Sequence, residues 1–323
     1  MILVVLLMNI LENEISMTLK QSSYIKLIIA VILWSSIYHV AKYLVIAADI
    51  PSITFFRFFI TSVALLIWYS KKHGNIIGNI KSLKQHFILI FFIGFFGIFV
   101  YTLSFFFAEK FISAEEVVIL FALTPILTSI LSLIFLKEKI NCIGWLGILI
   151  ALAGAIAVLS LSSKECGKIF CLALVSKLSI GQLLALLACF SMAVYSILSK
   201  KAVQRKIDSR AINTFSTVLI SILLFANFMF FNGSHLLMEF DKPVLFWVAI
   251  FYTAIFGTVI PYQFYIDAIQ NIEVSKVTIF QNAIPPCTIL MGAFIHQEKL
   301  TWMEIAAGII IITGVIITNF SKK

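Results

Sequence analysis

One stretch of this sequence occurs twice. Residues 108–160 and 268–320 align without a gap at a constant offset of 160. Each copy is a long apolar run with a proline near its middle and a Glu-Lys step at its end, and a second apolar run with a late glycine follows. The shared markers are Pro125, Glu138-Lys139 and Gly154 in the first copy, and Pro285, Glu298-Lys299 and Gly314 in the second. Chance apolar similarity does not keep a proline, a charged pair and a glycine in one register. We therefore interpret the stretch as a duplicated pair of membrane helices.

The composition requires lipid as part of the solvent. The chain is 61% hydrophobic and 12% charged, which is more apolar surface than the cores of a soluble protein can hide. Ten apolar runs are each near the roughly 20 residues that a membrane-spanning helix needs. They cover 25–46, 52–70, 86–107, 113–136, 141–160, 180–200, 210–231, 243–267, 273–296 and 301–320. The runs lack the alternation that the strands of a transmembrane barrel show.

The runs divide the chain into four parts. We expect an N-terminal tail at 1–24, a first five-helix repeat at 25–161, an outside connecting loop at 162–179 and a second five-helix repeat at 180–320. The tail begins with an apolar run too short to span a bilayer, and Met17 is an alternative start. Cys166 and Cys171 share the connecting loop, where they either form a disulfide or stay free.

The distribution of basic residues predicts how the chain lies in the membrane. With both termini cytoplasmic, the inner segments hold 16 Lys and Arg and the outer segments hold 7, as the positive-inside rule requires. Five helices in each repeat make the two repeats enter from opposite sides. The predicted fold is therefore an all-α integral membrane protein with ten transmembrane helices, arranged as two inverted five-helix repeats. This orientation explains the net charge of +9, and no nucleic-acid partner is expected.

Inverted repeats are a recurrent design of secondary transporters, because two similar halves can exchange roles and open a central site to either side. The helix pairs FLKEKI…GWLGILIALAGAIAV and IHQEKL…AAGIIIITGVII, and the helix openings LWSSIYHVAKY and MAVYSILSKK, resemble the EamA branch of the drug/metabolite transporter superfamily. The resemblance covers residues 25–320. It implies a multi-pass permease of the cytoplasmic (inner) membrane. Carriers of this family move amino acids, nucleotide derivatives, sugars or toxic organic compounds.

The resemblance also places the openings of the first and sixth helices at the cavity wall, which makes Trp34 a candidate substrate-binding residue. Two residues there depart from the family pattern. Ser35 follows the tryptophan where a glycine is usual, and Met192 stands where an aromatic residue is common. These departures reflect either substrate choice or drift.

Ionisable side chains inside a span are costly and usually have a reason to be there. Arg57 either binds a carboxylate or phosphate as a planar fork or extends toward the membrane interface. His39 either couples transport to protons or is a hydrogen-bonded structural residue. Glu115 and Glu116 begin the fourth span, where they are either a proton or counter-ion site or acids favoured by the helix dipole.

Prolines interrupt equivalent helices of the two halves, and the carbonyls that they free are tolerated at membrane depth where they line a cavity. Two further candidates, Tyr101 and Gln263, lie on the third and eighth helices. The candidate binding residues in and beside the prolines are Thr124, Pro125, Gln281, Asn282 and Pro285. The repeated acids Glu138 and Glu298 lie at turns and predict a cap or a tether to neighbouring backbone.

The leading hypothesis is a secondary active transporter of a small polar metabolite that works by alternating access. An amino acid or an S-adenosylmethionine-like derivative is favoured, because the candidate cavity mixes Arg57, amides and aromatic rings. An exporter of drug-like or toxic compounds is the alternative, and an integral membrane enzyme acting on lipid is a third reading. We expect no catalytic residues, no metal and no cofactor, because the sequence has neither a P-loop nor a His paired with an acid at catalytic spacing. The expected partners are a small-molecule substrate, membrane lipid, coupled protons and a second copy of the chain in a homodimer.

Overall fold

The computed structural model describes residues 19–73, 84–112, 117, 120–121, 123–162, 179–232, 241–296 and 302–320, and no strand occurs within these ranges. The first half of the chain contains the helices α2 (Leu19–Ala47), α3 (Ile50–His73), η1 (Lys84–His86), α5 (Phe87–Gly94), η2 (Phe95–Val100), α6 (Tyr101–Phe111), α8 (Thr124–Phe135) and α9 (Cys142–Ser162). The second half contains α10 (Ile180–Gln204), α11 (Ser209–Asn232), α13 (Val244–Ala254), η5 (Ile255–Val259), α14 (Ile260–Asn271), α15 (Val274–Thr278), η6 (Ile279–Ala283), α16 (Ile284–His296) and α17 (Trp302–Phe320). Two of these short elements, η2 and η5, are π-helical turns inside otherwise continuous helices.

Six helical segments are long and apolar enough to cross a membrane, by length and composition. They are Leu19–Ala47, Ile50–Lys71, Lys84–Phe111, Ile180–Gln204, Ser209–Phe231 and Val244–Asn271. The other four expected spans contain α8, α9, α15 to α16 and α17, of which the described apolar parts are shorter. Ten membrane crossings therefore stay a prediction. The first helix begins at Leu19, so it includes the last residues of the expected tail.

Some expectations fall on residues outside the described ranges. These are the tail before Leu19, most of the connecting loop with Cys166 and Cys171, and the acids Glu115, Glu116 and Glu298. Nothing in the structure bears on them.

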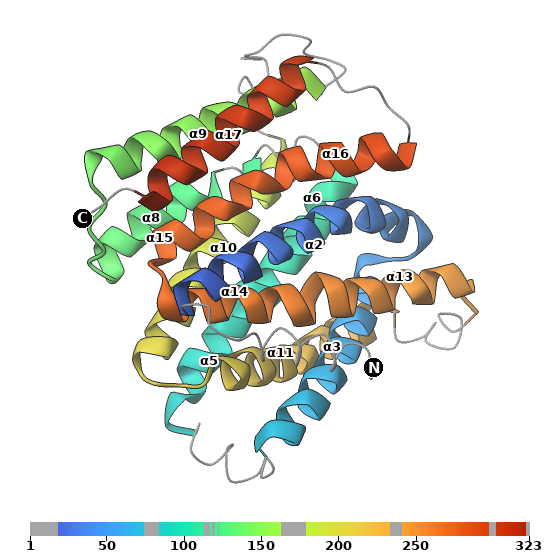
Figure 1. Ribbon diagram of the computed structural model, residues 1–323. Coiled ribbons are helices and arrows are strands. Elements are labelled where there is room, and N and C mark those ends of the chain that lie inside the picture. The colour runs from blue at the N-terminus through green and yellow to red at the C-terminus, as the bar shows by residue number, and fades with distance from the viewer. Residues whose placement is uncertain are drawn as a thin grey trace.

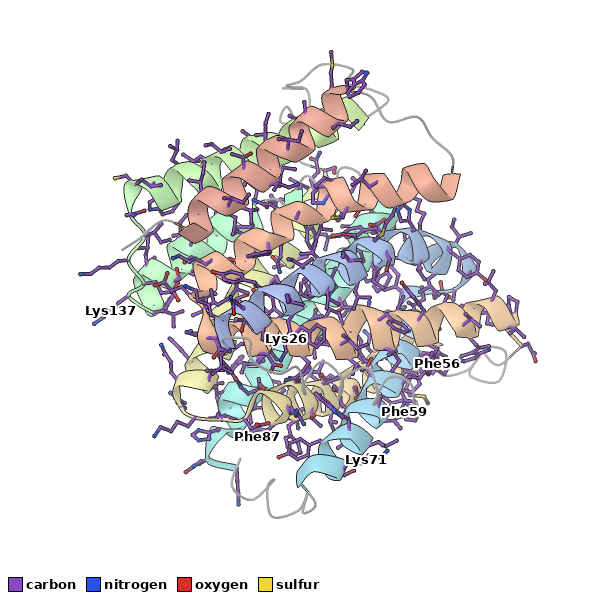
Figure 2. The ribbon with its side chains drawn as sticks, viewed as in Figure 1. Lys26, Phe56, Phe59, Lys71, Phe87 and Lys137 are labelled. Carbon is purple, nitrogen blue, oxygen red and sulfur yellow. The ribbon has the colours of Figure 1, made fainter. Side chains whose placement is uncertain are left out.

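The outer surface is apolar, as lipid contact requires. Phe59 on α3 and Phe87 on α5, both labelled in Figure 2, have exposed fractions of 53% and 50%. Exposed Phe, Leu and Ile side chains recur on most of the helices. A helix that is apolar both inside the bundle and outside it needs lipid around it.

Equivalent helices of the two halves pack against each other at both edges of the bundle. Figure 1 shows α9 beside α17 at one edge and α3 beside α11 at the other. On α9, Gly147 meets Thr318 of α17, whereas the later Gly154 meets the earlier Ile311. The contact therefore runs antiparallel. The α3–α11 pair is also antiparallel, since the ring of Phe55 stacks on Phe228 at 5.0 Å while Ser62 hydrogen-bonds to the earlier Ser221 at 2.6 Å.

The first helix of each half packs on the third helical segment of the other half. α2 lies along α14 and η5, and α10 lies along α6 and η2. The amino group of Lys26 contacts the carboxylate of Asp267 at 2.6 Å, and further along the same pair Ile37 packs on Gly257. In the equivalent contact between α10 and η2, the ring of Tyr195 packs on Gly97. Exchanging the two halves maps one of these contacts onto the other.

Candidate functional site

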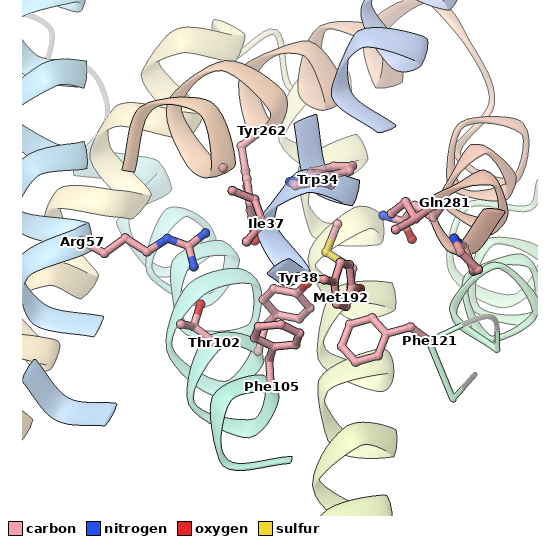
Figure 3. Close-up of a pocket in the computed structure, with 14 residues that line it drawn as sticks. Trp34, Ile37, Tyr38, Arg57, Thr102, Phe105, Phe121, Met192, Tyr262 and Gln281 are labelled. Atoms are coloured by element: carbon pink, nitrogen blue, oxygen red, sulfur yellow. The ribbon is translucent and has the colours of Figure 1, made fainter. Parts of the chain in front are cut away.

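A cavity lies at the centre of the bundle, where the two halves meet. Its volume is about 50 Å³, which is room for a few water molecules. The lining comes from α2, α3, α6, α10, α14, the two turns η5 and η6, and α16, together with Phe121, which precedes α8. The lining residues are Trp34, Ile37, Tyr38, Arg57, Tyr101, Thr102, Phe105, Phe121, Met192, Gly257, Tyr262, Gln281, Ile284 and Pro285. Figure 3 shows their side chains converging from both halves.

Half of the candidates drawn from the sequence line this cavity. They are Trp34, Arg57, Tyr101, Gln281 and Pro285. Met192, which departs from the family pattern, also lines it, whereas Ser35 does not. The Ser35 hydroxyl instead contacts the carbonyl of Ile284 on α16 at 3.3 Å.

The remaining candidates lie around the cavity and not in its wall. Nε2 of His39 is 3.1 Å from the carbonyl oxygen of Thr288, so this side chain joins α2 to α16. Thr124 and Pro125 are buried at the start of α8. Asn282 is 1% exposed, and neither of its amide atoms has a hydrogen-bond partner in the described part of the chain. A buried amide without a hydrogen-bond partner is energetically costly.

Gln263 belongs to a separate polar cluster between α2, α11 and α14. Its Nε2 donates to Oδ1 of Asp267 at 2.8 Å and to Oγ of Ser209 at 3.0 Å. Its Oε1 accepts from Nδ2 of Asn213 at 3.3 Å. The same Asp267 makes the ion pair with Lys26. Because these partners already use the amide, Gln263 serves here as a bridge between helices.

Arg57 is the charged side chain of the cavity wall. It lies on α3, is 7% exposed, and points from one side toward the space between Ile37 and Tyr262 (Figure 3). Its Nε and Nη2 both donate to the hydroxyl of Thr258, at 3.0 and 2.8 Å. The guanidinium carbon is 5.3 Å from the centre of the Phe58 ring, within reach of a cation–π contact.

No carboxylate forms an ion pair with Arg57 among the described residues. Its partners there are one neutral hydroxyl and aromatic rings. A buried cation without a counter-charge is costly. An anionic group in the cavity would supply that charge, and a guanidinium can hold a carboxylate or phosphate with more than one N–H.

Aromatic rings form most of the remaining wall. Trp34 meets Tyr262 edge-on with centroids 5.8 Å apart, and Phe105 meets Phe121 at 5.9 Å in the same manner. The hydroxyl of Tyr262 donates to the carbonyl of Gly97 in η2 at 3.2 Å, which ties the wall to the opposite half. Such rings offer an apolar surface to flat or hydrophobic groups and a negative face to cations.

Sequence reasoning missed most of these rings for an identifiable reason. Tyr38 lies on the same helix face as Trp34, four residues later, and Phe105 lies on the same face as Tyr101. Helical spacing from the two predicted residues could therefore have indicated Tyr38 and Phe105. Phe121 and Tyr262 give no comparable signal. The chain has 31 Phe and 9 Tyr, and those that face the cavity resemble those that face lipid.

Six apolar helices of spanning length, apolar outer faces and a central cavity shared by two equivalent halves define a multi-pass membrane protein. The model of the EamA-like transporter family matches residues 21–160 and again residues 179–320. The chain belongs to the EamA-like transporter family, and the resemblance to the EamA branch of the drug/metabolite transporter superfamily is confirmed.

The relatives carry transporter names. The uncharacterized transporter YetK of Bacillus subtilis (strain 168) is 26% identical over 306 residues, which cover 94% of this chain and 88% of the relative. The uncharacterized transporter YyaM of the same organism is 26% identical over 294 residues, covering 91% and 92%. A crystal structure 20% identical in sequence matches with a TM-score of 0.71 over 92% of this chain and 96% of the other. That likeness concerns the fold alone.

Proposed function

We propose that this membrane transporter is a secondary carrier of a small polar metabolite that works by alternating access. The antiparallel packing of equivalent helices, α9 with α17 and α3 with α11, supports ten helices in two inverted repeats. Inverted repeats let a central site open to either side by moving one half against the other. A cavity with room for a few waters fits a closed stage of such a cycle.

Arg57 is the observation that carries the substrate class. It is buried in the cavity wall with a hydroxyl and rings as partners, so an anionic group of the substrate is the counter-charge that the site needs. Gln281, which lies across the cavity from Arg57 in Figure 3, supplies an amide, and the rings between them suit an apolar or cationic portion. An amino acid, or an S-adenosylmethionine-like amino-acid derivative, joins these features in one molecule.

Export of drug-like or toxic compounds is the second candidate, and the aromatic wall favours it. Flat hydrophobic molecules stack on such rings without needing Arg57. Catalysis on a lipid is the weaker reading, because Arg57, Gln281 and the rings bind and orient molecules and include no nucleophile with a neighbouring base.

The membrane and the partners follow from the same proposal. The excess of basic residues in the expected inner segments supports a cytoplasmic membrane with both termini inside. Lipid is the partner of the exposed apolar faces. Coupled protons and a homodimer are part of the proposal and rest on the transporter class.

Counterflow in proteoliposomes tests the proposal. A panel of labelled amino acids, nucleotide derivatives and sugars, with and without a pH gradient, identifies the cargo and its coupling. Arg57→Ala should abolish exchange of an anionic cargo. Arg210→Ala is the matched control, because Arg210 is also a buried arginine but lies outside the cavity, over the ring of Trp68.

Two results would count against the proposal. Normal exchange by folded Arg57→Ala removes Arg57 from the site. Exchange of hydrophobic cations, but of no panel member, by the wild-type protein favours the export reading over metabolite transport.

A further inference from the structure

Each half contains one π-helical turn at the same place. The turns η2 and η5 begin at residues 95 and 255, which is the offset of 160 that relates the two halves. Each turn places a glycine, Gly97 or Gly257, against a side chain of the first helix of the other half. A π-turn that recurs at the same position in both halves is part of the architecture that the two halves share. Such turns are frequent at functional sites.

The turn η5 adds a hydroxyl that faces the cavity arginine. Oγ1 of Thr258 donates its proton to the carbonyl of Thr253, five residues earlier, at 3.1 Å. A hydroxyl has one proton to give and two lone pairs. With the proton used on Thr253, the oxygen accepts the two hydrogen bonds from Arg57. Every hydrogen-bonding capacity of this hydroxyl is therefore used, and its direction is fixed.

The symmetry-related contact, between the seventh helix and η2, lacks both members of this pair. The offset of 160 puts Ile98 at the place of Thr258. The second and seventh helices align at an offset of 159, at which Ser62 matches its hydrogen-bond partner Ser221, and this puts Ser216 at the place of Arg57. An isoleucine has no hydroxyl to offer, and a serine has no cation to be held. Both halves therefore have the π-turn and its glycine. The arginine and the hydroxyl that accepts its hydrogen bonds occur in one of the two symmetry-related contacts.

We propose that Thr258 is a positioning residue of the transport site, which holds the guanidinium of Arg57 for an anionic group in the cavity. Both bonds to Thr258 use Nε and Nη2, and Nη1 has no hydrogen bond in the described part of the chain. A long arginine side chain loses rotamer freedom when it is fixed. Thr258 fixes it before cargo arrives, so that cost does not fall on binding. The inference rests on the proposed role of Arg57 in binding an anionic group.

The test compares three variants with the wild-type protein. Thr258→Val keeps the shape and removes the hydroxyl, whereas Thr258→Ser keeps the hydroxyl. Thr253→Val is the matched control, because Thr253 is also buried in this helical segment and its hydroxyl donates to the carbonyl of Ile250 at 3.0 Å. All four proteins are compared only as preparations with the same elution profile.

The first measurement needs no cargo. Phenylglyoxal condenses with guanidinium nitrogens, and peptide mass spectrometry follows Arg57, Arg205 and Arg210 separately. We expect Arg57 to react severalfold faster in Thr258→Val, because Nη2 is released, and at the wild-type rate in Thr258→Ser and Thr253→Val. The rates at Arg205 and Arg210 should stay constant. Equal Arg57 rates in Thr258→Val and wild type would overturn the proposal.

The second measurement is counterflow of a labelled mixture of the protein amino acids. Thr258→Val should raise the concentration for half-maximal exchange about tenfold or more while the maximal rate changes less, and Thr258→Ser should restore it. A purely structural role would lower the maximal rate and leave the half-saturating concentration unchanged. If Arg57→Ala loses exchange and Thr258→Val behaves as wild type in both measurements, the inference fails and the proposed function stands. If Arg57→Ala exchanges normally, the proposed function fails whatever Thr258 does.

Discussion

Glu138 joins the two halves through the end of a helix, and its loss should destabilise the protein measurably. Its carboxylate accepts from the backbone N–H of Val274 at 2.9 Å and from that of Ser275 at 3.3 Å, and from the Ser275 hydroxyl at 3.1 Å. These groups begin α15, and the residue that precedes that helix, Glu273, provides no side-chain cap. Glu138 therefore supplies the cap from the opposite half.

The turn after α8 holds Glu138 in place. Lys137 has a positive φ of 55°, and the N–H of Glu138 bonds to the carbonyl of Ser132 at 3.2 Å. A residue in the left-handed conformation directly after the C-cap is a common way to end a helix. The carboxylate is thus aimed at α15 by backbone geometry, which limits the entropy lost when the cap forms.

The magnitude follows from three charge-assisted hydrogen bonds at a helix N-terminus. A hydrogen bond to a charged group contributes about 1.5–3 kcal/mol, the helix dipole adds about 0.3–1 kcal/mol, and bonds that share one acceptor group do not add in full. We expect Glu138→Ala to lower the free energy of unfolding by about 2–4 kcal/mol. Glu138→Gln should cost about half of that, because an amide oxygen still accepts.

Unfolding in mixed detergent micelles, followed by circular dichroism, measures these differences. Lys139→Ala is the control, since Lys139 is an exposed neighbour of Glu138. Ser275→Ala should cost about 1 kcal/mol, and in a double-mutant cycle it should lose most of its effect once Glu138 is alanine. Equal unfolding free energies for Glu138→Ala and Lys139→Ala would refute the capping argument.

Two further predictions concern contacts between the halves. A side chain at Gly147 or Gly314 would meet the backbone of the facing helix in the α9–α17 pair, so alanine at either position should cost about 1–3 kcal/mol of unfolding free energy. Gly308→Ala on the same helix is the control, since the nearest atom there is 3.5 Å away. Asp267→Ala should destabilise more than Lys26→Met, because Asp267 accepts hydrogen bonds from Lys26, Ser209 and Gln263. Equal losses in that pair of variants would mean that the ion pair alone matters.

The sequence predicted the helices well because their signals are local. The expected span 180–200 is observed as Ile180–Gln204, and it starts at a capping box between Ser179 and Gln182. The tether expected at Glu138 is confirmed by its hydrogen bond to the backbone N–H of Val274. It could be predicted because a charged residue at a turn between two apolar runs has few other roles. Glycines and prolines that recur at the constant offset of 160 allowed the duplication to be recognised in the sequence.

Features that depend on contacts between distant helices could not be predicted in this way. Each π-turn contains a glycine, Gly97 or Gly257, but a glycine in an apolar run does not by itself indicate a π-turn. Gln263 was expected in the cavity, and only the packing of α11 against α14 shows that its amide bonds to Asn213 and Ser209. The choice between readings of Arg57 also needed the fold, because burial beside Thr258 distinguishes a cavity residue from one that reaches toward the interface.

The two halves are alike in the contacts between the first helix of one half and the third of the other, and they differ at the cavity wall. Gly97 and Gly257 each accept a side chain of the opposite first helix, so close packing is preserved under exchange of the halves. Trp34 and Met192 stand at matching places of the first and sixth helices and both line the cavity, yet one is aromatic and the other is not. The alternating access proposed above would require two halves that can adopt each other's conformation, which would keep these shared contacts symmetric. Under the function proposed above, a cargo without two-fold symmetry would be contacted by different residues of the two halves, and the pairing of Arg57 with Thr258 supports that proposal.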